Sequence, residues 1–121
     1  MKQVLGAIVF IMFITACGNN TNEGNANGNA NTSDPNYNKG MELIANSNCL
    51  SCHKLNEKAI GPAFQDVANK YENNDVNRKM LANKIIYGGV GNWGNIAMAP
   101  HPEINQTDAE TMVKYILLLR K

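Results

Sequence analysis

The sequence predicts an all-α domain of about four short helices joined by long loops. Apolar residues recur at helical spacing in four separate segments, and no segment alternates apolar and polar residues as a half-buried strand does. The clearest of the four, close to the C-terminus, also begins with a helix-capping pattern. We expect this domain to span residues 37–121, after two segments of different composition.

We expect residues 1–16 to be a signal peptide. Lys2 precedes an apolar run over residues 4–14, which is shorter than the roughly 20 residues of a membrane-spanning helix. The run ends in "ITAC", which resembles the cleavage box of bacterial lipoproteins, and Cys17 would then carry the lipid. Two alternatives stay open, namely an uncleaved anchor and ordinary cleavage near Ala16 that leaves Cys17 as a free thiol.

Residues 17–36 are predicted to be a flexible linker. After the cysteine the segment is nearly all Asn, Gly, Thr and Ala, with no aliphatic side chain larger than alanine. A flexible chain of this length has an end-to-end distance of roughly 25 Å. A lipidated Cys17 would therefore hold the domain at the extracytoplasmic face of the cell membrane while leaving it free to turn.

The first two helices are predicted over residues 37–48 and 62–71, and Pro62 suits the first turn of the second. In the first helix, three apolar side chains are expected to face inward: Met41, Leu43 and Ile44.

The third helix is predicted from residue 75 to a stop at Gly88 and Gly89, and the fourth over residues 107–121. A capping box of Thr107 and Glu110 would begin the fourth helix. The apolar positions expected to face the core are Val76, Met80, Ile85 and Ile86 in the third helix, and Met112, Val113, Ile116 and Leu119 in the fourth.

A long segment without regular pattern, residues 88–105, separates the last two helices. Loops of this length in compact domains are usually functional or disordered. This one contains Trp93, Ile96 and Met98, whose apolar side chains need a surface to pack on. Because a domain of this size is small for a self-sufficient core, a bound prosthetic group would both fill the core and order the loop.

The motif "CLSCH", residues 49–53, has three possible uses: a dithiol redox centre, half of a zinc site, or attachment of a haem. A zinc site needs about four ligands, and outside the motif only His101 and Cys17 remain. A thioredoxin-like dithiol expects a βαβ setting, which the helical pattern does not offer. The spacing C-x-x-C-H matches c-type haem attachment, in which Cys49 and Cys52 add to the haem vinyl groups and His53 is placed to bind iron.

Together these segments resemble the class I c-type cytochromes, most closely the small bacterial cytochromes of the c-551 kind. The similarity covers the domain and rests on "CLSCH", the Gly61-Pro62 pair, "NWGNIAMAP" and the C-terminal helix with Tyr115. It implies a small haem-wrapped fold, a Pro62 carbonyl that faces the proximal histidine, and a Trp93 that lies along the haem. Family members often have "MPPN", whereas this chain has "MAPH", with His101 at the place of the asparagine.

The sixth iron ligand is predicted to be Met98. Two of the other methionines lie in the signal segment, and three have the helical apolar spacing of core residues, so Met98 alone lies in a loop. The family spacing, five residues after Trp93, implies the same choice. His101 is the alternative ligand, although its loop position and the family pattern favour a role at the surface or beside the site.

The resemblance implies one covalent haem c in a one-electron carrier of a respiratory chain that is not an enzyme and has no small-molecule substrate. The expected partners are redox proteins such as a terminal oxidase and a quinol-oxidising complex. Nucleic acid is excluded as a partner because the net charge is +1 and no basic run is present. The alternatives are a haem sensor or peroxidase-like enzyme whose Met98 dissociates, and a thiol-redox protein without haem.

Overall fold

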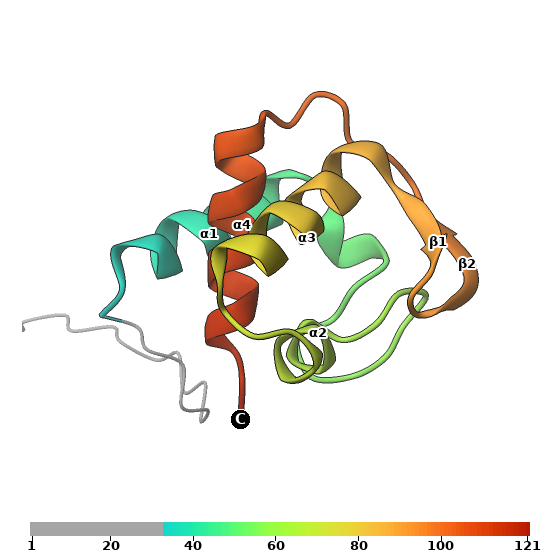
Figure 1. The fold of residues 1–121 in the computed structure, drawn as a ribbon, viewed down its shortest axis with the longest axis horizontal. Coiled ribbons are helices and arrows are strands. Elements are labelled where there is room, and N and C mark those ends of the chain that lie inside the picture. The colour runs from blue at the N-terminus through green and yellow to red at the C-terminus, as the bar shows by residue number, and fades with distance from the viewer. Residues whose placement is uncertain (1–32) are drawn as a thin grey trace, which may run out of the picture.

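The computed structural model describes residues 33–121, and the predictions for Cys17, the signal peptide and most of the linker lie outside this range. Within it, the predicted all-α class is confirmed (Figure 1). The elements in chain order are α1 (Pro35–Asn46), the 3₁₀-helix η1 (Cys49–Ser51), α2 (Phe64–Lys70), α3 (Asp75–Tyr87), β1 (Gly89–Gly91), β2 (Gly94–Met98) and α4 (Gln106–Leu118).

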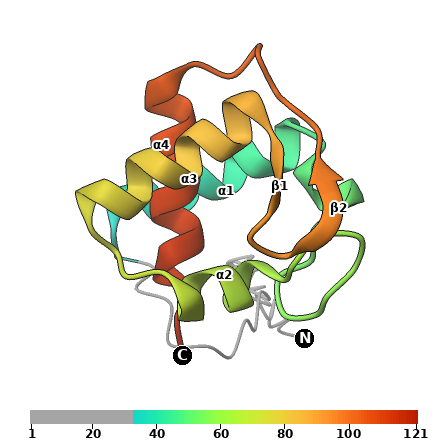
Figure 2. The ribbon, with the colours of Figure 1, turned by 45° about the vertical axis from the view of Figure 1, so that its right-hand side comes forward.

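Helix α4 is the centre of the fold, because it packs against α1, α3 and α2 (Figures 1 and 2). Its contact with α1 is close: a Cβ atom added to Gly40 would collide with the side chain of Tyr115. The ring of Tyr37 also meets the ring of Tyr115 edge-on, with 5.1 Å between centroids. The glycine therefore lets the backbone of α1 lie directly against the Tyr115 side chain of α4.

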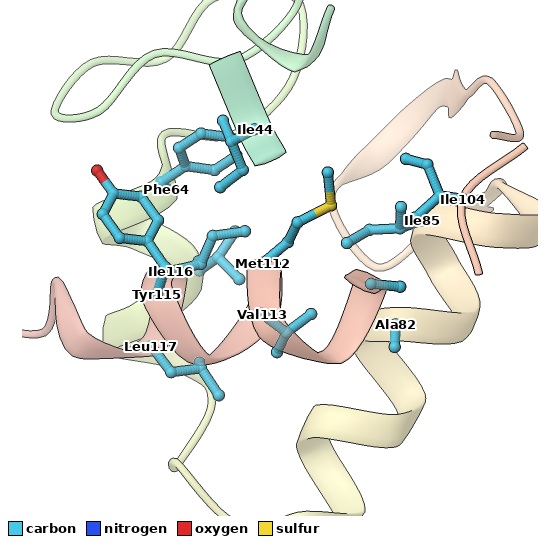
Figure 3. Packing of buried hydrophobic residues seen from close by; sticks show 12 residues of the cluster. Ile44, Phe64, Ala82, Ile85, Ile104, Met112, Val113, Tyr115, Ile116 and Leu117 are labelled. Carbon is cyan, nitrogen blue, oxygen red and sulfur yellow. The ribbon is translucent and has the colours of Figure 1, made fainter. Parts of the chain in front are cut away.

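The core is built along one face of α4. Met112 and Val113 are its largest fully buried side chains, and α1, α2 and α3 each add apolar side chains around them (Figure 3). The sequence predicted both residues for the apolar stripe, and Tyr115 and Leu117 are buried as well.

Two of the predicted inward positions are wrong. Met41 is 45% exposed and Val76 is 77% exposed. In α1 the buried positions are Gly40 and Ile44, because the close crossing with α4 selects the face that carries the glycine. Val76 lies in the first turn of α3. The buried residues of this helix, Ala82 and Ile85, lie in its later turns.

The helix termini differ from the prediction in two places. The capping box of Thr107 and Glu110 is wrong: α4 begins at Gln106, and the side chain of Asn105 caps it by accepting a hydrogen bond of 3.0 Å from the Asp108 amide. Pro62 lies before α2, which begins at Phe64, so its place in the first turn is wrong too.

The predicted stop of α3 is confirmed. The helix ends at Tyr87, and Gly88 follows with a φ angle of 68°, which favours glycine. No helix in residues 33–121 has the length and apolar character needed to cross a bilayer.

The segment expected to lack regular structure contains a small antiparallel hairpin of β1 and β2. Gly89 pairs with Met98 and Gly91 with Gly94, with an irregular register between the two pairs. Gly91 and Gly94 have φ angles of 113° and 109°, and these glycines make the tight turn possible. The same glycines interrupt the alternation by which a strand is recognised in a sequence, so the strands were not predicted.

Candidate functional site

The "CLSCH" motif winds into one tight turn. In and after η1, the amides of Cys52 and His53 both donate to the Cys49 carbonyl, at 3.2 and 3.0 Å. Asn48, in the left-handed region with a φ angle of 57°, turns the chain into this segment from α1. Cys49, Cys52 and His53 all line the same cavity as a result.

The imidazole of His53 is held on two sides. Its Nδ1 atom lies 2.8 Å from the Pro62 carbonyl oxygen, the contact that the family resemblance implied. Its ring stacks on Phe64, with 5.1 Å between centroids and 16° between planes. Because a carbonyl can only accept, Nδ1 carries the proton and Nε2 keeps the lone pair that a metal ion would bind.

Gly61 allows this arrangement by having no side chain. A Cβ atom added there would lie 2.5 Å from Cε1 of His53. The Gly61 amide also donates to the Cys52 carbonyl at 2.8 Å, which ties the segment before α2 to the motif. No local pattern predicts these contacts of Gly61 and Phe64 with His53. The available signals were a glycine directly before Pro62 and an aromatic residue two positions after it.

The two motif thiols are free and half-buried. Burial raises the pKa of the Cys49 thiol, which keeps it protonated at neutral pH. Within residues 33–121, no group of three or more His, Cys, Asp and Glu side chains could hold a metal ion. The geometry therefore gives no support to a disulfide or a zinc site at the motif.

The motif opens onto a cavity of about 360 Å³ that is lined by residues from all four α-helices and both strands. The lining is mostly apolar, and four of its large apolar side chains are exposed to solvent: Ile60, Val90, Trp93 and Ile96. Exposed apolar surface costs about 25 cal/mol per Å² relative to burial. The thiols, the imidazole and this apolar wall fit an apolar macrocycle such as a haem, which would cover the exposed side chains.

Met98, the last residue of β2, lines the same cavity as the motif, although the two are far apart in the sequence. Its side chain is half-buried and packs on the core cluster. The backbone of Met98 lies close to Gly88, because a Cβ atom at Gly88 would collide with the Met98 carbonyl oxygen. The structure thus brings His53 and Met98 to one cavity, although 45 positions separate them in the sequence.

His101 also lines the cavity, and its backbone amide and its ring Nδ1 atom have partners of their own. Its amide donates to the carbonyls of Ile85 and Ile86 at 3.0 and 3.1 Å, which fixes the chain after Met98 against the end of α3. Its Nδ1 atom lies 3.1 Å from a Glu103 carboxylate oxygen. A hydrogen bond from the backbone of Glu103, and then the His101 ring, lower the pKa of that carboxyl group.

Trp93, in the turn between β1 and β2, forms part of the cavity wall and is 39% exposed. The Lys70 ammonium lies 4.4 Å from the centre of its ring. Lys70 was not among the predicted site residues, because no local pattern connects a lysine with a tryptophan 23 positions later.

Comparisons with known proteins agree with this geometry. A family model for cytochrome c matches residues 37–120. Cytochrome c-552 of Nitrosomonas europaea is 38% identical over 79 residues, which cover 65% of this chain and 77% of that protein. Cytochrome c-551 of Azotobacter vinelandii is 38% identical over 78 residues, which cover 64% of this chain and 94% of that protein.

The similarity extends to the fold. The crystal structure of the wild-type Nitrosomonas europaea cytochrome c552 matches with a TM-score of 0.62 at 38% identity, over 65% of this chain and 98% of that one. Members of this family carry one covalently attached haem c, and the cofactor predicted from Cys49 and Cys52 is confirmed. The motif, the cavity and these relatives together place the chain in the cytochrome c family of electron-transfer haem proteins.

Proposed function

We propose that this protein is a membrane-tethered one-electron carrier of a respiratory chain, in which His53 and Met98 would bind the iron of its haem. The observation that carries the proposal is the 2.8 Å contact of His53 Nδ1 with the Pro62 carbonyl, which leaves Nε2 as the metal-binding nitrogen. Met98 is the sulfur ligand that lines the same cavity. When bound, haem c supplies a one-electron couple between ferric and ferrous iron.

The residues around the cavity have separate tasks in this proposal. Cys49 and Cys52 attach the macrocycle, Pro62 orients His53, and the apolar wall that includes Trp93 excludes water. A thioether ligand favours ferrous iron and so raises the reduction potential. Because His53 and Met98 would both bind the iron, the chain itself would leave no place there for a substrate, which favours a carrier over an enzyme.

The tether and the partners complete the proposal. The sequence from Cys17 to the domain supports a lipid anchor followed by a flexible spacer, on the extracytoplasmic face of the cell membrane. Redox partners such as a terminal oxidase and a quinol-oxidising complex would then be met at high local concentration, so that weak docking over a small interface suffices.

The ligand assignment is tested by replacing Met98 and His101 separately by alanine. We expect the ferric wild-type protein to show the weak band near about 695 nm that His–Met ligation produces. Met98→Ala should abolish the band, admit carbon monoxide to the ferrous iron and lower the potential. His101→Ala should keep the band and shift the potential only modestly, because the band reports the Met98 thioether and a residue beside the site tunes the iron without binding it.

Two results would contradict the assignment. Loss of the native sixth ligand in His101→Ala, with that ligand retained in Met98→Ala and no band near about 695 nm in the wild type, would make His101 the ligand. Ready binding of carbon monoxide by the ferrous wild-type protein at neutral pH would favour the haem sensor or peroxidase-like enzyme, in which Met98 dissociates. Haem that is extracted by acid-acetone from the wild type would disprove the covalent attachment itself.

A further inference from the structure

The hairpin of β1 and β2 carries Met98 but has little support of its own. It pairs mainly with itself and stands at the edge of the molecule (Figures 1 and 2). All its residues except Met98 are exposed. An isolated two-stranded hairpin is marginally stable in water, and glycines with positive φ angles at positions 89, 91 and 94 weaken this one further.

One side chain from outside the hairpin holds its turn. Lys70, the last residue of α2, donates a hydrogen bond of 2.9 Å from its ammonium to the Asn92 carbonyl. The same ammonium lies 4.4 Å from the centre of the Trp93 ring, well inside the distance of about 6 Å over which a cation is attracted to an aromatic face. Both contacts fall on the two residues that connect β1 to β2.

The other end of the hairpin is already fixed. The chain after Met98 is held to the end of α3 by the bonds of the His101 amide, and Gly88 fits closely against the Met98 carbonyl. The contact of Lys70 at the turn therefore restrains the other end of β2. Only four residue steps separate Gly94, next to the turn, from Met98.

From this geometry we infer that Lys70 is a positioning residue for Met98, acting through Asn92 and Trp93. The inference rests on the proposed His–Met ligation. The Lys70 ammonium holds the turn of the hairpin against α2, and this keeps β2 in the place from which the Met98 sulfur reaches the cavity. Removing the ammonium should raise the fraction of molecules in which Met98 has left the iron.

The test measures that fraction by competition with a small ligand. Imidazole is titrated into the ferric, full-length haem protein at constant pH, and loss of the band near about 695 nm is followed. The apparent dissociation constant for imidazole is inversely proportional to the fraction of molecules without Met98 ligation, so a larger fraction gives a smaller constant. For Lys70→Met, which keeps the aliphatic chain but loses the charge and the donor, we expect a decrease of about three- to tenfold.

Two further variants separate positioning from a general effect of charge. Lys79→Met removes the charge of an exposed lysine on α3 that makes no ion pair or side-chain hydrogen bond within the described residues, and it should bind imidazole like the wild type. Lys70→Arg keeps a cation that can both donate to the carbonyl and stack on the indole, and it should restore most of the wild-type affinity. Amide hydrogen exchange should be faster in the hairpin of Lys70→Met and unchanged in α4.

The results distinguish this inference from the proposed function. Absence of the band in the wild type would disprove His–Met ligation itself. With the band present, equal imidazole affinities for Lys70→Met and Lys79→Met would disprove the role of Lys70. A Lys70→Arg variant that binds imidazole as tightly as Lys70→Met would disprove it too. If Lys70→Met gives no mature haem protein, Lys70→Gln, which keeps a donor without the charge, is compared in the same way, and wild-type affinity there would also overturn the inference.

Discussion

Gly61 determines the place of the His53 imidazole through the space that it leaves. Its Cα lies where any Cβ atom would come within 2.5 Å of the His53 ring, while its amide holds the Cys52 carbonyl. The next residue, Pro62, then presents its carbonyl to Nδ1 of His53. Two neighbouring residues thus set both the position and the protonated nitrogen of the imidazole.

A side chain at Gly61 should displace the imidazole. For Gly61→Ala we expect a loss of about 1–3 kcal/mol in the free energy of unfolding of the haem protein, the usual cost of overpacking, and a lower yield of mature protein. Gly61→Val should be worse, because it adds two more methyl groups at the same point. Denaturant unfolding followed at the Soret band measures this, and unchanged stability in both variants would contradict the close contact.

The start of α4 is decided by Asn105. Its side-chain oxygen accepts from the Asp108 amide, and its side-chain nitrogen donates to the Asp108 carboxylate at 2.8 Å. Thr107 lies one position inside the helix, where its backbone carbonyl accepts from the Thr111 hydroxyl. The cap matters for the whole domain because α4 is the helix that contacts α1, α2 and α3.

Alanine substitutions at the two positions distinguish the observed cap from the capping box that the sequence predicted. Asn105→Ala should lower the free energy of unfolding by about 1 kcal/mol, the typical cost of losing a cap. Thr107→Ala should change it by only a few tenths of a kcal/mol, since an exposed threonine inside a helix contributes little. Equal losses for the two variants, measured by urea denaturation, would contradict the assignment of Asn105 as the cap.

At the scale of the whole molecule, the apolar interior has two parts. One is the packed cluster along α4 around Met112 and Val113 (Figure 3), and the other is the cavity whose wall includes exposed apolar side chains. Met112 and Val113 belong to both, so the cofactor would lie directly against the core. The small domain therefore depends on its haem for a complete core as well as for its chemistry.

The proposed tether is tested at Cys17, outside the described residues. We expect the mature wild-type protein to begin at a Cys17 that carries lipid and to fractionate with membranes, because two or more acyl chains give firm anchoring. Cys17→Ser should disturb processing or release a soluble domain with an unchanged visible spectrum. An unmodified Cys17 thiol in the mass spectrum of the native protein would exclude the lipid anchor.

The sequence by itself determined the features that depend on near neighbours. The attachment motif, the stop of α3 at Gly88 and the buried face of α4 all follow from spacings within one or two turns of chain. The prediction of Met98 rests on a related argument, that the helical spacing of the other domain methionines places them in the core. The structure supports that argument for Met112, which is fully buried, and not for Met41, which is 45% exposed.

Only the tertiary structure decided the contacts between segments that are distant in the chain. The buried face of α1 depends on how closely α4 crosses it, so Gly40 lies at the interface and Met41 does not. The approach of Lys70 to Trp93 depends on where the hairpin turn comes to lie beside α2. Local spacing carries no information about either, because the distance between two elements is set by the packing of all the others.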